Sequence, residues 1–163
     1  MLIKLKNKDT LIIDEFIFKC SVGKNGIKIK KKEGDKITPR GIYSLGKLYY
    51  RADRIKKPLT RVKTKIIKKN MGWCDDSKSK YYNKEIKIND EMKHEKLYRN
   101  DNIYDCLIVI KYNMKNKIPY KGSAIFIHLT KDYKKTADCI ALKKRDFLIL
   151  AKLLSPISKI EIS

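Results

Sequence analysis

The sequence predicts a mainly β domain with one notable helix near its C-terminal end. Two continuous apolar runs, residues 106–110 and 124–129, have the length and the apolar character of buried central strands. Several shorter segments alternate between apolar and polar residues, and only one segment has convincing helical spacing. The chain has 163 residues, 42% of them hydrophobic, which suits one packed core. We therefore expect a single domain over residues 1–163.

Shorter strands are expected around the two apolar runs. The pair Asn25-Gly26 lies between apolar segments, a pattern typical of a hairpin turn. Gly and Pro residues mark 33–41 as a loop. The expected short strands are residues 10–13, 16–18, 27–30, 42–45, 61–66 and 157–162.

Two other segments differ from this strand pattern. Residues 70–102 are irregular and contain the only tryptophan, Trp73. Their length indicates a functional excursion rather than a simple connection. Residues 144–154 repeat apolar side chains at helical spacing, with Asp146 in the first turn and Pro156 beyond the end. A helix is therefore expected there.

The chain is strongly basic, with a formal net charge of +22 at pH 7. Such a surface can contact an anionic polymer. Only six of the 40 basic residues are Arg, the side chain that reads bases most often. We therefore expect no specific nucleic acid partner, and a solvated lysine-rich face without any partner remains the alternative.

Cysteine and histidine usage narrows the possible chemistry. The four cysteines are Cys20, Cys74, Cys106 and Cys139, and none forms a C-x-x-C pair. With two histidines in the chain, neither a zinc site nor a disulfide framework is expected. We expect no metal and no cofactor.

His128 and Cys139 are the candidate reactive pair. His128 lies near the end of an apolar strand, and Cys139 follows eleven residues later after a polar loop. An imidazole can promote the thiolate, which is the nucleophilic form of cysteine. Taken by spacing alone, the pair can equally be a buried structural thiol and a structural histidine.

These residues also carry a family resemblance. Residues 122–128, ending in His128, and 136–142, around Cys139, resemble the active-site region of YkuD-type L,D-transpeptidases, in particular a short single-domain proteobacterial branch. The collinear segments 34–41, 50–54, 72–76, 94–99, 104–105 and 112–113 are similar to the same branch.

The resemblance implies a β-sandwich catalytic domain that cross-links peptidoglycan stem peptides. Cys139 would attack a stem-peptide carbonyl, form a thioester and pass the acyl group to an amine of a second stem. His128 would act as the base, the carbonyl of Leu129 would orient it, and the N–H groups of Asp138 and Cys139 would stabilise the oxyanion. The candidates for substrate binding are Trp73, Asp75, Asp76, Arg99, Tyr112 and Asn113.

The sequence departs from the broad family after the histidine, after the cysteine, and in the stretch Thr136-Ala137-Asp138, where the broad family has Ser-His-Gly. Leu129 replaces a Gly after the histidine and Ala141 replaces an Arg after the cysteine, and both fit the short branch. Asp138 replaces a Gly directly before Cys139 and fits neither pattern. A carboxylate beside the thiol is expected to raise the thiol pKa and to disfavour attack.

Two alternative functions follow from the same residues. One is a related L,D-carboxypeptidase or hydrolase, in which water resolves the thioester. The other is a catalytically weakened domain whose lysine-rich surface holds a wall polymer. No signal peptide or transmembrane segment is visible in the sequence, so a place in the periplasm or cell envelope is implied by the resemblance alone.

Overall fold

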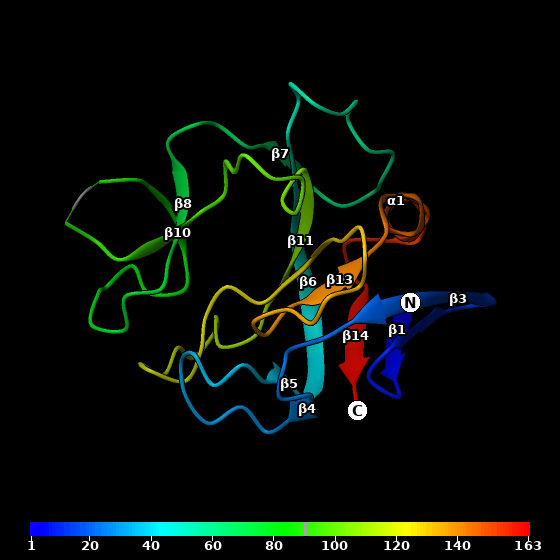
Figure 1. Cartoon of the computed structure of the whole chain (residues 1–163), viewed down its shortest axis with the longest axis horizontal. Helices are drawn as coiled ribbons and strands as arrows, with labels where there is room; N and C mark the ends of the chain where they lie inside the picture. The colour runs from blue at the N-terminus through cyan, green and yellow to red at the C-terminus, as the bar shows by residue number, and fades with distance from the viewer. Residues whose placement is uncertain (90) are drawn as a thin grey trace.

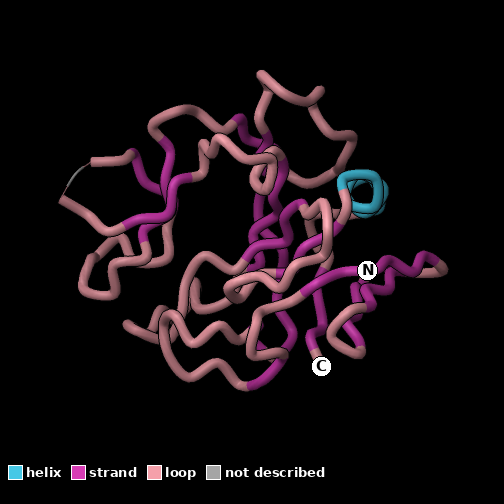
Figure 2. Tube along the Cα trace, in the orientation of Figure 1, coloured by secondary structure: helices cyan, strands magenta, loops and turns pink. Residues whose placement is uncertain are grey.

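A computed structural model describes residues 1–89 and 91–163 of the chain. Its main sheet has nine strands and one short helix packs beside it (Figures 1 and 2). The strands follow the order β11-β12-β13-β3-β2-β1-β14-β6-β7, and β11 also pairs with β6. Their bounds are β1 (Leu2–Lys6), β2 (Thr10–Ile13), β3 (Phe16–Ser21), β6 (Gly41–Tyr50), β7 (Thr64–Ile66), β11 (Cys106–Ile110), β12 (Phe126–Leu129), β13 (Ile140–Leu142) and β14 (Lys159–Ile162).

The expected mainly β fold with one helix is confirmed, but the main sheet is barrel-like rather than a sandwich of two separate layers. The reason is that two strands, β6 and β3, each pair with different neighbours along their length. The first residues of β6 pair with β14, and residues 45–50 pair with β11. In β3, residues 16–19 pair with β2, whereas residues 20 and 21 pair with β13. The sheet therefore closes on itself.

The barrel interior is apolar and is completed by the helix. Leu48, Ile108 and Ile127 are fully buried in this core. Helix α1 (Lys144–Leu153) adds Phe147, Leu150 and Ala151 to the same cluster, and its carboxyl end has Leu154 as its cap. The expected helix, 144–154, agrees to within one residue. No helix in the described ranges is long and apolar enough to cross a membrane.

A second, smaller sheet covers one outer face of the barrel (Figure 1). Its strands are β8 (Met71–Cys74), β9 (Glu85–Lys87) and β10 (His94–Lys96), in the order β10-β8-β9. The excursion expected at residues 70–102 is thus partly ordered as strands. Each strand has only three or four residues, too few for a clear alternation. A separate parallel pair joins β4 (Ile27–Lys28) to β5 (Thr38–Pro39).

A second core lies between the barrel and the small sheet. Trp73 packs edge-on against Phe126 of β12 and Tyr49 of β6, at centroid distances of 5.2 and 6.4 Å. Leu107 belongs to the same cluster, as does Cys139. Strands β11 and β12 are therefore buried on both faces, which explains why they appear in the sequence as continuous apolar runs.

Candidate active site

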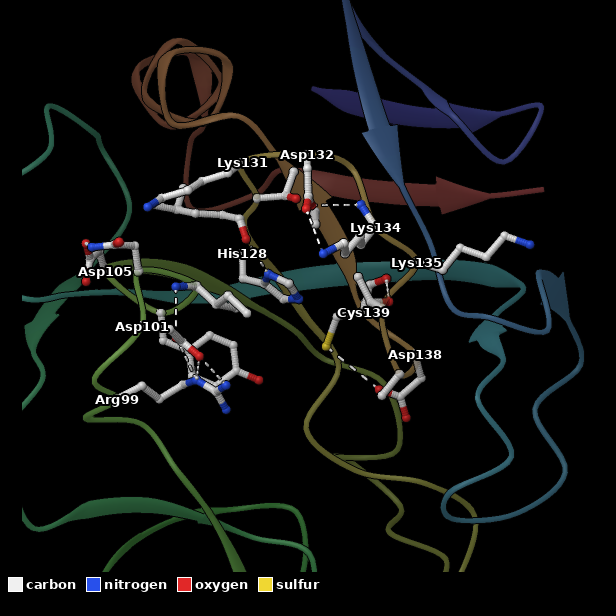
Figure 3. A pocket seen from close by; sticks show the side chains of 18 of the residues that line it. Arg99, Asp101, Asp105, His128, Lys131, Asp132, Lys134, Lys135, Asp138 and Cys139 are labelled. Carbon is white, nitrogen blue, oxygen red and sulfur yellow. Dashed lines mark hydrogen bonds and ion pairs between the residues drawn. The ribbon is translucent and has the colours of Figure 1, made fainter.

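His128 lies in β12, and Cys139 lies directly before the adjacent parallel strand β13. His128 is the register partner of Ala141 of β13. Both side chains line one cavity of about 900 Å³. Figure 3 shows the imidazole and the thiol at the wall of this cavity. The parallel pairing therefore brings together two residues that are eleven positions apart.

The thiol of Cys139 is buried and hydrogen-bonded to backbone. Phe126 N–H donates to Sγ at 3.3 Å, and the thiol donates to the carbonyl of Ala124 at 3.3 Å. Burial raises the thiol pKa well above its ordinary value, and the charges of Asp138 and Glu95 raise it further. The resting group is a thiol, so a nucleophilic role requires a base.

Ala124 holds its carbonyl against the thiol in a strained backbone conformation. Its φ of +54° lies in the left-handed region that non-glycine residues seldom adopt. The side-chain oxygen of Asn83 accepts from Ala124 N–H at 3.1 Å and from the Trp73 indole at 2.9 Å. Its amide nitrogen donates to the carbonyls of Tyr112 and Asn113. Asn83 therefore ties this turn to the second core.

The imidazole of His128 is held in one tautomer. Its Nδ1 lies 2.9 Å from the carbonyl oxygen of Leu129. A carbonyl can only accept, so Nδ1 carries the proton and Nε2 keeps its lone pair. Burial lowers the pKa of His128 to about 4, so the ring is neutral at pH 7. Among the described contacts no hydrogen bond links Sγ to the ring, so the thiol must first leave Ala124.

Asp138 belongs to a buried charged network. Its Oδ2 lies 3.2 Å from Nζ of Lys30, a lysine with no exposed side-chain surface. The same Nζ lies 2.6 Å from Asp35 Oδ1. Burial raises the pKa of Asp138 to about 6, against the opposing effect of Lys30. Asp138 is not among the described residues with positive φ, so the aspartate does not strain the backbone where a glycine is typical.

Glu95, Tyr104 and Arg99 also line the cavity. The Tyr104 hydroxyl donates to Glu95, and its ring lies 5.5 Å from the His128 ring. The Arg99 guanidinium lies 5.1 Å above the Tyr104 ring and pairs with Asp101. Burial raises the pKa of Glu95 to about 7.

Basic side chains surround the mouth of the cavity. The exposed lysines that line it are Lys24, Lys36, Lys131, Lys134, Lys135 and Lys144. Asp132 is an exposed carboxylate on the same lining and pairs with Lys134. Within residues 1–89 and 91–163, no three His, Cys, Asp or Glu side chains gather as a possible metal site.

The structure separates the six candidate substrate-binding residues. Arg99 lines the large cavity, whereas Asp75 and Asp76 line a second hollow of about 310 Å³. Trp73, Tyr112 and Asn113 line neither. Trp73 is packed in the second core and hydrogen-bonded to Asn83.

Tyr112 and Asn113 instead stabilise the turn before β12. The Tyr112 hydroxyl donates to the carbonyl of Lys121. Asn113 has a φ of +50°, and its amide donates to the carbonyls of Ile118 and Gly122. Their contacts are structural.

Sequence reasoning did not single out Lys30, Asn83, Glu95 or Tyr104. Glu95 and Tyr104 lie in the segments that carry the resemblance, which was a usable signal. Lys30 had none, because nothing in the sequence links it to Asp138, which it contacts across 108 positions.

A comparison with known families covers nearly the whole chain. Residues 3–162 match the YkuD family model, the L,D-transpeptidase catalytic domain. The match includes the cavity, Cys139 and His128. No curated protein and no solved structure matches the chain significantly.

Proposed function

The chain belongs to the L,D-transpeptidase family, which acts on peptidoglycan peptides, and we propose that it cross-links stem peptides through a thioester on Cys139. The observation that carries the proposal is the position of Cys139 and His128. His128 lies in β12 and Cys139 directly precedes the adjacent parallel strand β13, both at one cavity, with Nδ1 of the histidine fixed to the Leu129 carbonyl. In this proposal residues 1–163 form one catalytic domain.

Acylation begins with the thiol proton. Nε2 of His128 takes it once the thiol rotates away from the Ala124 carbonyl. The thiolate then attacks a carbonyl of the donor stem. The leaving amine of D-Ala takes the proton back from His128, and a thioester remains on Cys139. The neutral state of His128 supports its role as the acceptor of this proton.

The negative charge that develops on the carbonyl oxygen needs donors. Among the described hydrogen bonds, none uses the N–H of Asp138 or Cys139. Both groups are therefore available as oxyanion donors beside the buried Sγ.

Transfer completes the reaction. An amine of a second stem attacks the thioester carbonyl, the carbon–sulfur bond breaks, and the thiol is regenerated. Arg99 and the lysines at the mouth supply positive charge toward the carboxylates of the stem peptides. Since these peptides belong to the cell wall, the proposed site of action is the periplasm or cell envelope.

The structure also gives some support to a weakened, binding-only domain. The thiol is hydrogen-bonded to Ala124, and burial, with a further contribution from the charge of Asp138, raises its pKa. In that alternative the exposed lysines would hold an anionic wall polymer, and its binding would weaken steeply with salt. Resolution of the thioester by water is the third possibility and gives a trimmed stem.

Intact-mass spectrometry with purified tetrapeptide-stem muropeptides separates these functions. The expected result is an adduct on the wild-type protein and on Cys20→Ala, followed by cross-linked dimers, with no adduct on Cys139→Ala. Cys20 is a matched control because it is also a buried thiol, with a pKa raised to about 12 by burial, but it lies in β3. An adduct that decays to tripeptide without dimers would support the hydrolase. A folded protein without any adduct would contradict both enzymatic functions.

A further inference from the structure

The two oxygens of the Asp138 carboxylate lie in different environments. Its Oδ2 faces the buried ammonium of Lys30 at 3.2 Å. Its Oδ1 lies 3.8 Å from Sγ of Cys139, on the cavity side, and the side chain keeps 13% of its surface exposed. Figure 3 shows this side chain directed toward the sulfur. One oxygen is therefore anchored and the other faces the reacting atom.

Lys30 does not need Asp138 to balance its charge. Asp35 already binds Nζ at 2.6 Å. The carboxylate of Asp35 is itself fixed by the N–H groups of Lys31, Lys32 and Ile37, at 2.9 to 3.1 Å. These contacts lower the pKa of Asp35, although burial opposes them. Asp138 is thus a second carboxylate on a lysine that already has a partner.

Transfer has a requirement that acylation lacks. An alkyl amine with a pKa near that of lysine, about 10.4, is almost wholly an ammonium at neutral pH. It must enter a cavity whose mouth carries exposed lysines, and it must lose a proton before it can attack. The positive rim repels an ammonium, whereas Asp138 and Glu95 place carboxyl groups around Sγ.

We propose that Asp138 receives the acceptor amine of the cross-linking reaction: its Oδ1 binds the incoming ammonium and takes one proton from it. This inference rests on the proposed function, because it concerns the second half of that reaction. It assigns a role to Asp138, a residue at which this chain departs from the family pattern.

The distances allow one nitrogen to meet both partners. An attacking nitrogen approaches its carbon at about 3 Å, and a hydrogen bond to a carboxylate spans about 2.6–3.2 Å. The sum of these two distances exceeds the 3.8 Å between Sγ and Oδ1. A nitrogen bonded to Oδ1 can therefore approach a carbonyl carbon attached to Sγ.

Protons and electrons balance over the step. The ammonium gives one proton to Asp138 and becomes a neutral amine. The nitrogen lone pair forms the new bond to carbon, and the carbon–sulfur bond breaks with its electron pair on sulfur. The second nitrogen proton passes to His128 and then to the thiolate. Asp138 releases its proton to solvent through the cavity.

The test separates transfer from acylation. The thioester is formed with a tetrapeptide-stem muropeptide and isolated, and its decay is followed by intact mass at a pH of about 8, where a lysine-like acceptor is still protonated. The two acceptors are a tripeptide stem with a diamino acid side chain and hydroxylamine, which is already neutral. In Asp138→Asn, transfer to the stem should slow by roughly 10²-fold, while transfer to hydroxylamine stays unchanged.

Two further variants keep the test decisive. Asp138→Gly restores the residue typical of the family and should show the same selective loss if the Asn variant folds poorly. Its acylation should be faster than wild type, because a negative charge beside the thiol is removed. Asp132→Asn is the matched control, since it removes an exposed carboxylate from the same lining, and should change neither rate.

Each contrary outcome has a distinct meaning. An equal loss with both acceptors, or no loss with either, in the Asn and Gly variants would overturn the role of Asp138 and leave the proposed function standing. If the wild-type protein forms no thioester at all, the proposed function fails and this inference fails with it.

Discussion

The two faces of β12 have different tasks. Ile127 and Leu129 point into the apolar core of the barrel. Phe126 and His128 point the other way, toward the second core and the cavity. The strand alternates because successive side chains lie on opposite faces. One short strand therefore contributes stability with one face and chemistry with the other.

The difference extends to the polar groups. Around the outer face Asn83 accepts from Ala124 N–H, and the Tyr104 hydroxyl donates to Glu95. Such groups are costly to bury unless they are paired. Substitutions on the inner face should therefore alter stability alone, and those on the outer face should alter reactivity or the packing of the second core.

The largest expected effect lies on the outer face, at His128. His128→Ala should reduce the rate of thioester formation by about 10²-fold or more, since base catalysis commonly contributes that much. The fold should be nearly unchanged. Intact mass against time with a tetrapeptide stem measures the rate. His94→Ala is the control, because this other histidine lies in β10 with Nδ1 against the Met92 carbonyl. A variant as fast as wild type would remove His128 from the mechanism.

The next effect compares the two faces directly through stability. Ile127→Ala should lower the free energy of unfolding by about 2–5 kcal/mol and leave the acylation rate per folded molecule unchanged. Asn83→Ala removes four hydrogen bonds, each worth about 1 kcal/mol net, and should also lower the free energy of unfolding. Because Asn83 bonds to the indole of Trp73, this variant should in addition alter the environment of Trp73.

Denaturant unfolding and native tryptophan emission distinguish the two variants. Trp73 is the only tryptophan and lies in the second core, so its emission should shift in Asn83→Ala and not in Ile127→Ala. An emission shift in both, or a slowed acylation in Ile127→Ala, would mean that the two faces are coupled.

The same contrast explains what the sequence could predict. The two central strands and the helix were visible because burial on both faces gives long apolar runs, and helical spacing is regular over ten residues. The strand at 42–45 proved longer, Gly41–Tyr50, because Gly46 and Lys47 interrupt its apolar pattern. Barrel closure was not predictable, since it depends on which strands pair with β3 and which pair with β6.

The candidate site was predictable where a short stretch of chain forms it. The position of Cys139 next to His128 comes from one strand pair and one loop. Roles for Trp73, Tyr112 and Asn113 were not predictable, because polar and aromatic residues in an irregular segment can line a cleft or hold a turn. The structure uses these three for packing and backbone contacts.

The smallest expected effect is a pH dependence of stability at Glu95. Burial raises the pKa of this carboxyl from 4.5 to about 7, so the folded protein holds a proton there that the unfolded chain has lost between these values. Stability from this group is therefore full below about pH 4.5 and is lost as the pH rises toward 7. Glu95→Gln should remove that loss, so the free energy of unfolding at pH 7 relative to pH 5 should rise above the wild-type difference.

Glu15→Gln, which changes an exposed carboxyl in the turn between β2 and β3, should leave that difference unaltered. His128 acts in the opposite direction: burial lowers its pKa from 6.5 to about 4, so its contribution is present above pH 6.5 and is lost as the pH falls toward 4. Urea titrations at several pH values in Glu95→Gln, in His128→Ala and in the variant that carries both substitutions separate the two contributions. If Glu95→Gln left the pH dependence unchanged, the carboxyl would be ionised in the fold, and its charge would then act on the Cys139 thiol at every working pH.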